Sequence, residues 1–331
     1  MSGETSLLTM LPRQTVGETR HLLTLAELGP EWMRSVLDLS HRMKRSPGRF
    51  RGVLAGGKLG MMFDKPSTRT RVSLEAAAWG LGMLPTVLRP DELQLGRGET
   101  VADTARVLSR YLNAFTIRTF SHAMVEEFAR NASIPTINAL TNDHHPCQAL
   151  ADVMTLEEVF GRLADLKVAF VGDGDNNVCH SLIEAAALGG FTLRVATPAA
   201  YRPNAAITER AMEIARKTGG EIILSTDPFE AVVGVDAIYA DVWTSMGKEE
   251  EQAARRSAFV RYRVDEALMA RAASTAIFLH CLPAHRGEEV TNEVIDGPQS
   301  RVWDQAENRL HVEMAALYVL ITGDLKGEKL P

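Results

Sequence analysis

Residues 167–196 read KVAFVGDGDNNVCHSLIEAAALGGFTLRVA and carry the pattern that decides the fold. A strand-like segment at 167–171, apolar after Lys167, is followed by a glycine-containing turn, and apolar residues then recur at helical spacing over 178–188. A second strand-like segment follows at 192–196. A strand, a helix and a strand in this order predict two parallel strands joined by a crossover helix. The stretch therefore predicts the start of a doubly wound α/β unit.

The same alternation of strands and helices extends along most of the chain. We predict further strands at 59–63, 85–88, 115–119, 136–140, 221–224, 237–242 and 276–282. Apolar residues at helical spacing predict helices at 69–81, 101–112, 123–132, 148–160, 205–217 and 305–321. The segment 249–263 is charged and weakly periodic, which predicts a surface loop. The fold class that this pattern indicates is α/β with parallel sheets.

The length of the chain predicts two domains, because a domain commonly spans ~100 to 200 residues and the chain has 331. We place the first domain at 1–150 and the second at 151–304. The final helix is apolar on most of its faces, which is typical of a helix buried on several sides. We therefore expect the region 305–331 to pack back on the first domain.

Charge and cysteine content limit the partners and the compartment. The chain has 36 Lys and Arg against 42 Asp and Glu, so its net charge of -6 would repel nucleic acid. No apolar run approaches the roughly 18 residues that a membrane helix needs, and the three cysteines show no paired short spacing. These features predict a cytoplasmic protein that binds neither nucleic acid nor a membrane.

The densest candidate anion site is the loop 66–71, PSTRTR, between a predicted strand and a predicted helix. Ser67, Thr68 and Thr70 supply hydroxyls, and Arg69 and Arg71 supply guanidinium groups. The first N–H groups of a helix lack partners within the helix, so together with these side chains they suit a phosphate. An ordinary Ser/Thr helix cap explains the same residues equally well. The chain has no Walker-type glycine loop, which disfavours a nucleoside triphosphate site.

A second candidate lies at residues 144–148, HHPCQ, where another helix is predicted to begin. His145 and Gln148 are three residues apart and can project toward one point. An imidazole and an amide are suitable for binding a carbonyl oxygen and a neighbouring amino group. Helix capping or packing is the alternative role.

A third candidate, residues 280–287, HCLPAHRG, directly follows a very apolar predicted strand. The carboxyl ends of parallel strands are where open α/β sheets bind ligands. Cys281 there is suited to be a nucleophile, a proton acceptor, a metal ligand or a small buried residue. A zinc site built from His145, Cys147, His280 and Cys281 has suitable atoms, but its spacing is not that of zinc sites, so we predict no metal.

Two more loops follow predicted strands. Residues 172–177, GDGDNN, match half of a dinucleotide-binding fingerprint, but the third glycine is missing and Thr197 stands where an acidic ribose ligand is expected. An NAD-linked dehydrogenase is therefore disfavoured, and Asn177 suits a side chain aimed into a cleft. Asp241 and Ser245, in the loop 241–247, suit an ammonium group, although a plain turn explains them too. A noncatalytic binding protein for a small anion or amino acid remains an alternative to an enzyme.

The order and spacing of these motifs together resemble the transcarbamylase family over almost the whole chain. The resemblance implies two doubly wound domains with the active site in the cleft between them, and trimers or multiples of trimers with shared active sites. It implies that Gln94 is donated to a neighbouring subunit and that Asn177, with Asn176 as the alternative, contacts the amino acid. The full set of substrate-binding residues that the resemblance implies is Ser67, Thr68, Arg69, Thr70, Gln94, Arg118, His145, Gln148, Asn177, Asp241, Ser245, Met246, Cys281, Leu282 and Arg309.

The resemblance also implies the reaction. The first domain would bind carbamoyl phosphate and the second ornithine, and the δ-amine of ornithine would take the carbamoyl group to give citrulline and phosphate. Cys281, Asp241, His145 and Arg118 would be catalytic, with Asp241, Cys281 and bound phosphate as alternative proton acceptors. No metal or organic cofactor is expected. Putrescine and N-acetylornithine remain alternative amine substrates, and the physiological direction of the reaction stays open.

Overall fold

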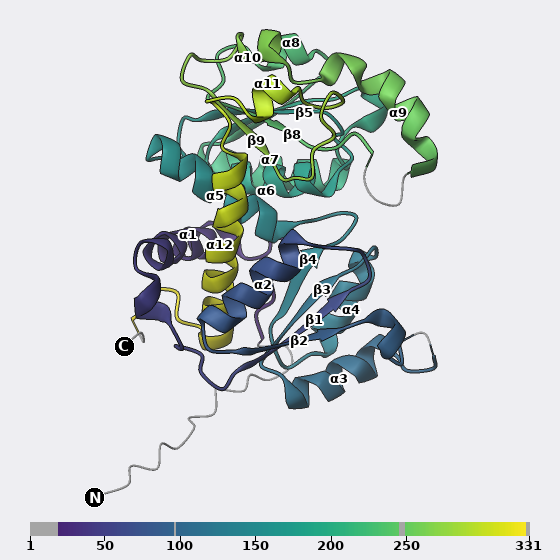
Figure 1. Ribbon diagram of the computed structural model, residues 1–331, viewed down its shortest axis with the longest axis vertical. Coiled ribbons are helices and arrows are strands. Elements are labelled where there is room, and N and C mark those ends of the chain that lie inside the picture. The colour runs from purple at the N-terminus through teal and green to yellow at the C-terminus, as the bar shows by residue number, and fades with distance from the viewer. Residues whose placement is uncertain (1–18, 96, 245–248, 329–331) are drawn as a thin grey trace, which may run out of the picture. The chain divides into compact units, whose positions relative to one another are not determined.

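The computed structural model describes residues 19–95, 97–244 and 249–328. The chain divides into two compact units, each built on its own parallel sheet (Figure 1). Unit 1 contains Ser35–Thr141 with the described parts of Met1–Leu23 and Leu310–Pro331. Unit 2 contains Thr24–Arg34 and the described part of Asn142–Arg309. The fold class predicted from the sequence, α/β with parallel sheets, is confirmed.

Unit 1 has a four-stranded sheet in the order β2-β1-β3-β4. Its strands are β1 (Lys58–Phe63), β2 (Leu84–Leu88), β3 (Ala114–Arg118) and β4 (Thr136–Leu140), and its crossover helices are α2 (Arg69–Gly80), α3 (Val101–Tyr111) and α4 (His122–Asn131). Because the chain runs one way from β1 to β2 and the other way from β2 to β4, right-handed crossovers place α2 on one face and α3 and α4 on the other. Phe115 of β3 stacks on Phe128 of α4 with ring centroids 4.7 Å apart, at the centre of this packing.

Unit 2 has a five-stranded sheet in the order β7-β6-β5-β8-β9. Its strands are β5 (Lys167–Val171), β6 (Thr192–Ala196), β7 (Glu221–Ser225), β8 (Ala237–Ala240) and β9 (Ile277–His280). Its helices are α5 (Pro146–Phe160), α6 (Asn177–Gly189), α7 (Ala205–Thr218), α8 (Pro228–Ala231), α9 (Gln252–Phe259), α10 (Glu266–Met269) and α11 (Asn292–Ile295). The strands of both sheets are parallel throughout.

In each sheet the strand order reverses at one place. The reversal lies between β1 and β3 in unit 1 and between β5 and β8 in unit 2. Crossovers on the two sides of such a point lead to opposite faces, so the carboxyl ends of these strands border a crevice where open α/β sheets bind ligands. The fold therefore directs attention to the loops after β1, β3, β5 and β8.

Two helices pass from one unit to the other along the chain: α1 (Gly29–Arg45) and α12 (Val302–Thr322). The sequence predicted α12 to within a few residues but gave no indication of α1. No helix among the described residues combines the length and apolar character that crossing a membrane requires.

The prediction of a surface loop at 249–263 is wrong. Helix α9 occupies the middle of this segment, between short 3-10 turns at Glu249–Glu251 and Val260–Tyr262. Phe259 and Tyr262 are buried in the apolar core of unit 2. Arg255 is buried as well. The sequence pattern predicted that this charged side chain faces solvent, but it lies on the buried face of α9.

Gly60 in β1 provides a test of the packing in unit 1. A Cβ atom at Gly60 would lie 2.4 Å from Leu112 Cδ1 and 2.5 Å from Phe115 Cδ2. Gly60→Ala should therefore lower the free energy of unfolding by about 1–3 kcal/mol, the usual cost of overpacking a core. Thermal unfolding followed by circular dichroism would show this as a lower Tm. Gly48→Ala is the matched control, because a Cβ atom there meets nothing within 4 Å. Equal Tm values for the two variants would contradict this packing.

Candidate active site

The predicted phosphate loop of unit 1 follows β1 and leads into α2. Thr68 occupies the N-cap position of α2, but its side chain makes no capping hydrogen bond. Its carbonyl oxygen accepts from the Val72 N–H at 3.0 Å instead. Ser67 and Arg69 are half-buried and Thr70 is buried. The Thr68 hydroxyl therefore does not cap α2. This favours the anion-binding interpretation of the loop.

Arg118 lies beside this loop at the reversal point of the sheet. It is the last residue of β3, pairs in register with Phe63 at the end of β1 and is buried. Its carbonyl oxygen accepts from the Asp64 N–H at 2.8 Å, which ties the end of β3 to the start of the loop. Unit 1 thus places Arg118 and the segment that leads to Arg69 at adjoining strand ends.

Gln94 belongs to a different part of unit 1. It is exposed in the connection between β2 and α3, where its carbonyl oxygen accepts from the Arg97 N–H at 2.9 Å. Its side chain is thus on the surface of unit 1.

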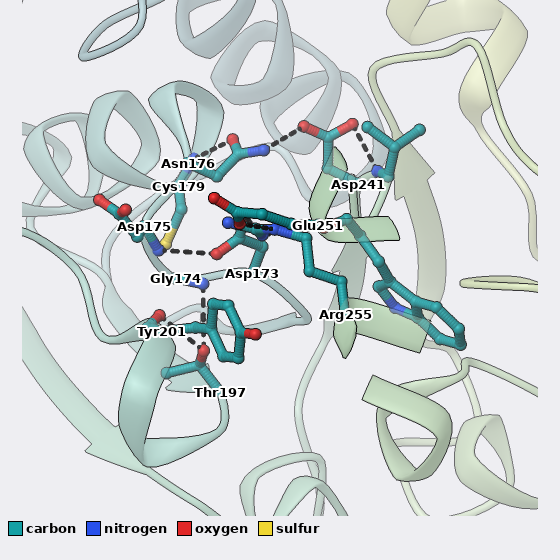
Figure 2. Close-up of polar contacts among 12 residues, drawn as sticks. Asp173, Gly174, Asp175, Asn176, Cys179, Thr197, Tyr201, Asp241, Glu251 and Arg255 are labelled. Carbon is teal, nitrogen blue, oxygen red and sulfur yellow. Dashed lines mark hydrogen bonds and ion pairs between the residues drawn. The ribbon is translucent and has the colours of Figure 1, made fainter. Parts of the chain in front are cut away.

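In unit 2 the carboxylate of Asp241 is the centre of a compact polar cluster. Asp241 directly follows β8 and is buried. Its Oδ1 atom accepts from the Cys281 thiol at 2.9 Å and from the Val242 N–H at 2.8 Å. Its Oδ2 atom accepts from Asn176 Nδ2 at 2.8 Å (Figure 2). All three donors are neutral. Within the described residues no Lys or Arg forms an ion pair with Asp241, so the site holds a desolvated negative charge suited to an ammonium group.

The two neighbouring asparagines have different environments. Asn176 caps α6: its Oδ1 atom accepts from the N–H groups of Val178 at 2.7 Å and Cys179 at 3.3 Å, while its Nδ2 atom faces Asp241. Both polar atoms of the Asn176 side chain are thus used within the chain. Asn177 is the first residue of α6 and is half-buried. This geometry favours Asn177 over Asn176 as the residue that contacts a ligand.

Sequence analysis missed a buried ion pair next to this cluster. Arg255 of α9 donates from Nη1 to Asp173 Oδ2 at 2.6 Å and to the Trp243 carbonyl at 3.0 Å, and from Nε to Glu251 Oε2 at 2.8 Å. Its guanidinium group also lies 4.8 Å from the ring centroid of Tyr201 (Figure 2). The Asp173 and Glu251 charges raise the pKa of Arg255 although burial opposes this. One side chain therefore ties the turn after β5 to Trp243 and to Glu251.

The glycine turn after β5 is closed by the chain itself. The Gly174 N–H donates to Thr197 Oγ1 at 3.1 Å, and the Thr197 hydroxyl donates to the Tyr201 carbonyl at 2.9 Å. A Cβ atom at Gly174 would lie 2.7 Å from that carbonyl. Thr197 holds the position where a dinucleotide site needs a ribose-binding acid. Gly174 thus serves a close backbone approach, which argues against an NAD site.

His145 and Gln148 lie at the start of α5 in unit 2. His145 is buried, its N–H donates to Ser181 Oγ at 2.8 Å and its side chain does not cap α5. The Gln148 side chain is held at both ends, since Oε1 accepts from Arg309 Nη1 at 2.9 Å and Nε2 donates to Asp152 Oδ1 at 2.8 Å. Three of the predicted residues, His145, Gln148 and Arg309, are thereby gathered on α5 and α12.

Cys281 and Leu282 directly follow β9. Leu282 has a left-handed backbone, with φ of 57°, and its N–H donates to His280 Nδ1 at 2.8 Å. Asp241, His280 and Cys281 each offer a possible metal-ligand atom within 4.8 Å of one another. Several of these atoms already have partners, because the thiol donates to Asp241 and His280 Nδ1 accepts from the Leu282 N–H. Such hydrogen bonding does not favour a cation here.

Ser245 and Met246, the remaining predicted residues, lie outside the described part of the chain.

Comparisons with known proteins agree with this arrangement. The model of the carbamoyl-P binding domain of aspartate/ornithine carbamoyltransferase matches residues 20–158, and the model of its Asp/Orn binding domain matches residues 164–320. The chain belongs to the aspartate/ornithine carbamoyltransferase family. The resemblance inferred from the motifs is confirmed.

Individual relatives of the family match nearly the full chain. An ornithine carbamoyltransferase from Gloeobacter violaceus is 50% identical over 312 residues, covering 93% of this chain and 99% of the relative. One from Bacillus thuringiensis subsp. konkukian is 52% identical over 302 residues, covering 91% and 94%. The solved structure of ornithine carbamoyltransferase from Pyrococcus furiosus matches with a TM-score of 0.88 and 47% identity, covering 92% of this chain and 97% of that one.

Arg69 and Arg71 allow a test of the anion site. We expect Arg69→Ala to weaken binding of inorganic phosphate at least about tenfold, because a charge-assisted hydrogen bond contributes roughly 1.5–3 kcal/mol. Arg71→Ala is the matched control, since Arg71 is exposed and pairs with Glu75 at 3.0 Å on the same helix. Isothermal titration on both folded variants would measure this. Unchanged affinity in Arg69→Ala, or an equal loss in Arg71→Ala, would remove Arg69 from the site.

Proposed function

We propose that the chain transfers the carbamoyl group of carbamoyl phosphate to the δ-amine of L-ornithine and releases L-citrulline and phosphate. The observation that carries this proposal is the match of a carbamoyl-P binding model to residues 20–158 and of an Asp/Orn binding model to residues 164–320. The relatives named above, which match nearly the whole chain, are ornithine carbamoyltransferases. The buried negative charge of Asp241 supports an amine substrate, because a second substrate carboxylate would be repelled there.

We assign the phosphate end of carbamoyl phosphate to unit 1. Ser67, Thr68, Arg69 and Thr70 supply hydroxyls, a guanidinium group and the first N–H groups of α2, and Arg118 adds a second positive charge at the neighbouring strand end. His145, Gln148 and Arg309 of unit 2 are proposed to bind the carbamoyl group. Asn177, Asp241, Ser245, Met246, Cys281 and Leu282 are proposed to bind ornithine.

The reaction requires the δ-ammonium of ornithine, with a pKa of roughly 10, to lose a proton before its nitrogen attacks. The nitrogen then bonds to the carbamoyl carbon, and the negative charge on the carbamoyl oxygen is stabilised by Thr70, Arg118 and His145. Collapse of this tetrahedral intermediate breaks the bond to the phosphate oxygen, and the departing phosphate takes the remaining extra proton from the attacking nitrogen. No metal or organic cofactor is needed, because every charge that develops has a partner among these side chains.

The contact between Cys281 and Asp241 supports a route for the proton. The Cys281 thiol donates to Asp241 Oδ1. An amine that approaches the sulfur can therefore pass its proton toward it while the thiol proton moves to the carboxylate. Cys281 remains uncarbamoylated in this scheme, and bound phosphate is the alternative acceptor.

We further propose a cytoplasmic homotrimer, or a multiple of trimers, in which Gln94 completes the site of a neighbouring subunit. The exposed position of Gln94 in unit 1 supports this. Exposed Trp79 and Leu84 on α2 and β2 supply apolar surface for subunit contacts. The three free thiols, Cys147, Cys179 and Cys281, fit a reducing compartment.

A panel of amines tests the substrate assignment. Putrescine lacks the α-carboxylate, so its kcat/KM should be at least about a hundredfold below that of ornithine, because a buried polar site rejects analogues that leave its groups unpaired. N-acetylornithine, whose α-nitrogen carries no charge, should be a similarly poor substrate. Aspartate should give no carbamoylated product. The measurement is carbamoylated product formed from carbamoyl phosphate by the native chain and by Asp241→Asn.

The two levels of the assignment fail separately. Equal kcat/KM for ornithine and putrescine would overturn the ornithine assignment and leave a carbamoyltransferase. Absence of any carbamoylated product would overturn the transferase itself. Asp241→Asn should lower kcat/KM for ornithine at least about tenfold, since it removes the charge that faces the amine.

Mixed subunits test the proposed donation of Gln94. Gln94→Ala and Asp241→Ala should each be nearly inactive alone. Coexpressed in equal amounts, they should recover about a quarter of native activity, because each shared site then has a one-in-two chance of each intact half. If the mixture is no more active than the two variants measured alone, each site draws both residues from one subunit.

A further inference from the structure

Asp152 is a buried carboxylate that the proposed reaction does not use. It lies on α5, one turn after Gln148, and has no exposed surface. Its Oδ1 atom accepts from Gln148 Nε2 at 2.8 Å and from Gln305 Nε2 at 2.6 Å. A buried carboxylate generally costs stability relative to an apolar side chain of similar size. Stability therefore does not explain why the Asp152 carboxylate lies between two carboxamides.

The first carboxamide, that of Gln148, lies between opposite charges. Its Nε2 atom faces the Asp152 carboxylate and its Oε1 atom accepts from Arg309 Nη1 at 2.9 Å. If the amide were rotated by half a turn, its oxygen would face the carboxylate oxygen and its NH₂ group would face the guanidinium group. Both contacts would be repulsive. Asp152 and Arg309 therefore allow only one orientation of Gln148, and Gln148 in turn fixes Arg309.

The second carboxamide, that of Gln305, connects Asp152 to the last residue of β9. Its Nε2 atom faces Asp152 and the Tyr239 hydroxyl, the latter at 3.1 Å, and its Oε1 atom accepts from the His280 N–H at 2.9 Å. His280 is the residue that leads into Cys281. One carboxylate thus orients two amides, and each amide holds a different part of the proposed site.

We propose that Asp152 is a positioning residue that fixes the orientations of Gln148 and Gln305, and through them Arg309 and the main chain that presents Cys281. This inference rests on the proposed function, which assigns the carbamoyl group to Gln148 and Arg309. Loss of Asp152 would leave these side chains present but free to turn, and misplaced binding groups reduce the rate much more than they reduce stability.

The conservative variant separates hydrogen bonding from charge. Burial raises the pKa of Asp152 to about 7, against the lowering effect of hydrogen bonds from Gln148 and Gln305 and of the Arg309 charge. In its uncharged form a carboxyl group keeps a carbonyl oxygen that accepts a hydrogen bond. Asp152→Asn keeps such an oxygen. We expect it to retain activity within a few-fold of native.

The experiment measures citrulline formation with carbamoyl phosphate and ornithine for Asp152→Ala, Gln148→Ala and the double variant. Asp152→Ala should lower kcat/KM for carbamoyl phosphate by about 10- to 100-fold. In the Gln148→Ala background the same change should have a clearly smaller effect, because one of the two residues through which Asp152 acts is already missing. Thr155→Val is the matched control. Thr155 is equally buried on α5, accepts from Asn308 Nδ2 of α12 at 2.9 Å and donates to the Ala151 carbonyl at 2.7 Å, so the kcat/KM of this variant should stay near native.

Each outcome has one meaning. Native kcat/KM in Asp152→Ala would overturn the positioning role, as would equal losses in the presence and absence of Gln148, which would indicate a merely structural residue. If Asp152→Ala does not fold, Asp152→Leu keeps the volume without the acceptor, and native activity in that variant overturns the proposal. Lack of turnover by the native chain would instead overturn the proposed function.

Discussion

The reversal of strand order in each parallel sheet is the constraint on which the rest of the site depends. It brings the carboxyl ends of β1 and β3 together in unit 1, and those of β5 and β8 together in unit 2. Because right-handed crossovers lead away to opposite faces, no helix needs to cover these strand ends. Arg118 ends β3, Asp241 follows β8 and Cys281 follows β9. Within unit 1 Arg118 pairs with Phe63, and within unit 2 Asp241 contacts Cys281, although the members of each pair are far apart in sequence.

Two buried carboxylates of unit 2, those of Asp173 and Asp241, have opposite kinds of hydrogen-bond partner. Asp173 is neutralised by Arg255, and the pair anchors α9 to the turn after β5. Among the described residues, Asp241 accepts hydrogen bonds from neutral donors, those of Cys281, Val242 and Asn176. The first carboxylate is therefore paired with a cation inside the protein, whereas the described residues orient the second by hydrogen bonds from neutral groups. In the proposed function, a substrate ammonium supplies the cation for Asp241.

The sequence predicted what depends on local pattern and missed what depends on distant partners. Apolar runs placed all nine strands of the described residues to within two residues at either end, and polar residues directly after those runs indicated the candidate site. The helical segment around Arg255 was missed because its burial depends on Asp173, 82 positions away in the sequence. Asn176 and Asn177 could not be told apart, since only the cap geometry of α6 distinguishes them. Asp152 gave no signal because Gln305, the second amide that it contacts, comes from 153 residues away in the sequence.

The environment of Cys281 decides between two kinds of thiol chemistry. A nucleophilic cysteine needs a neighbouring base or positive charge that takes its proton and stabilises the thiolate. Here the thiol donates to the Asp241 carboxylate, and His280 Nδ1 accepts from the Leu282 N–H and so does not serve the sulfur. Cys179 lies even further from reactivity, because burial and the charges of Asp173 and Asp241 raise the pKa of its thiol well above the ordinary value. A protonated thiol beside a fixed carboxylate is suited to orient an amine and relay its proton, and it is poorly suited to attack a carbonyl carbon.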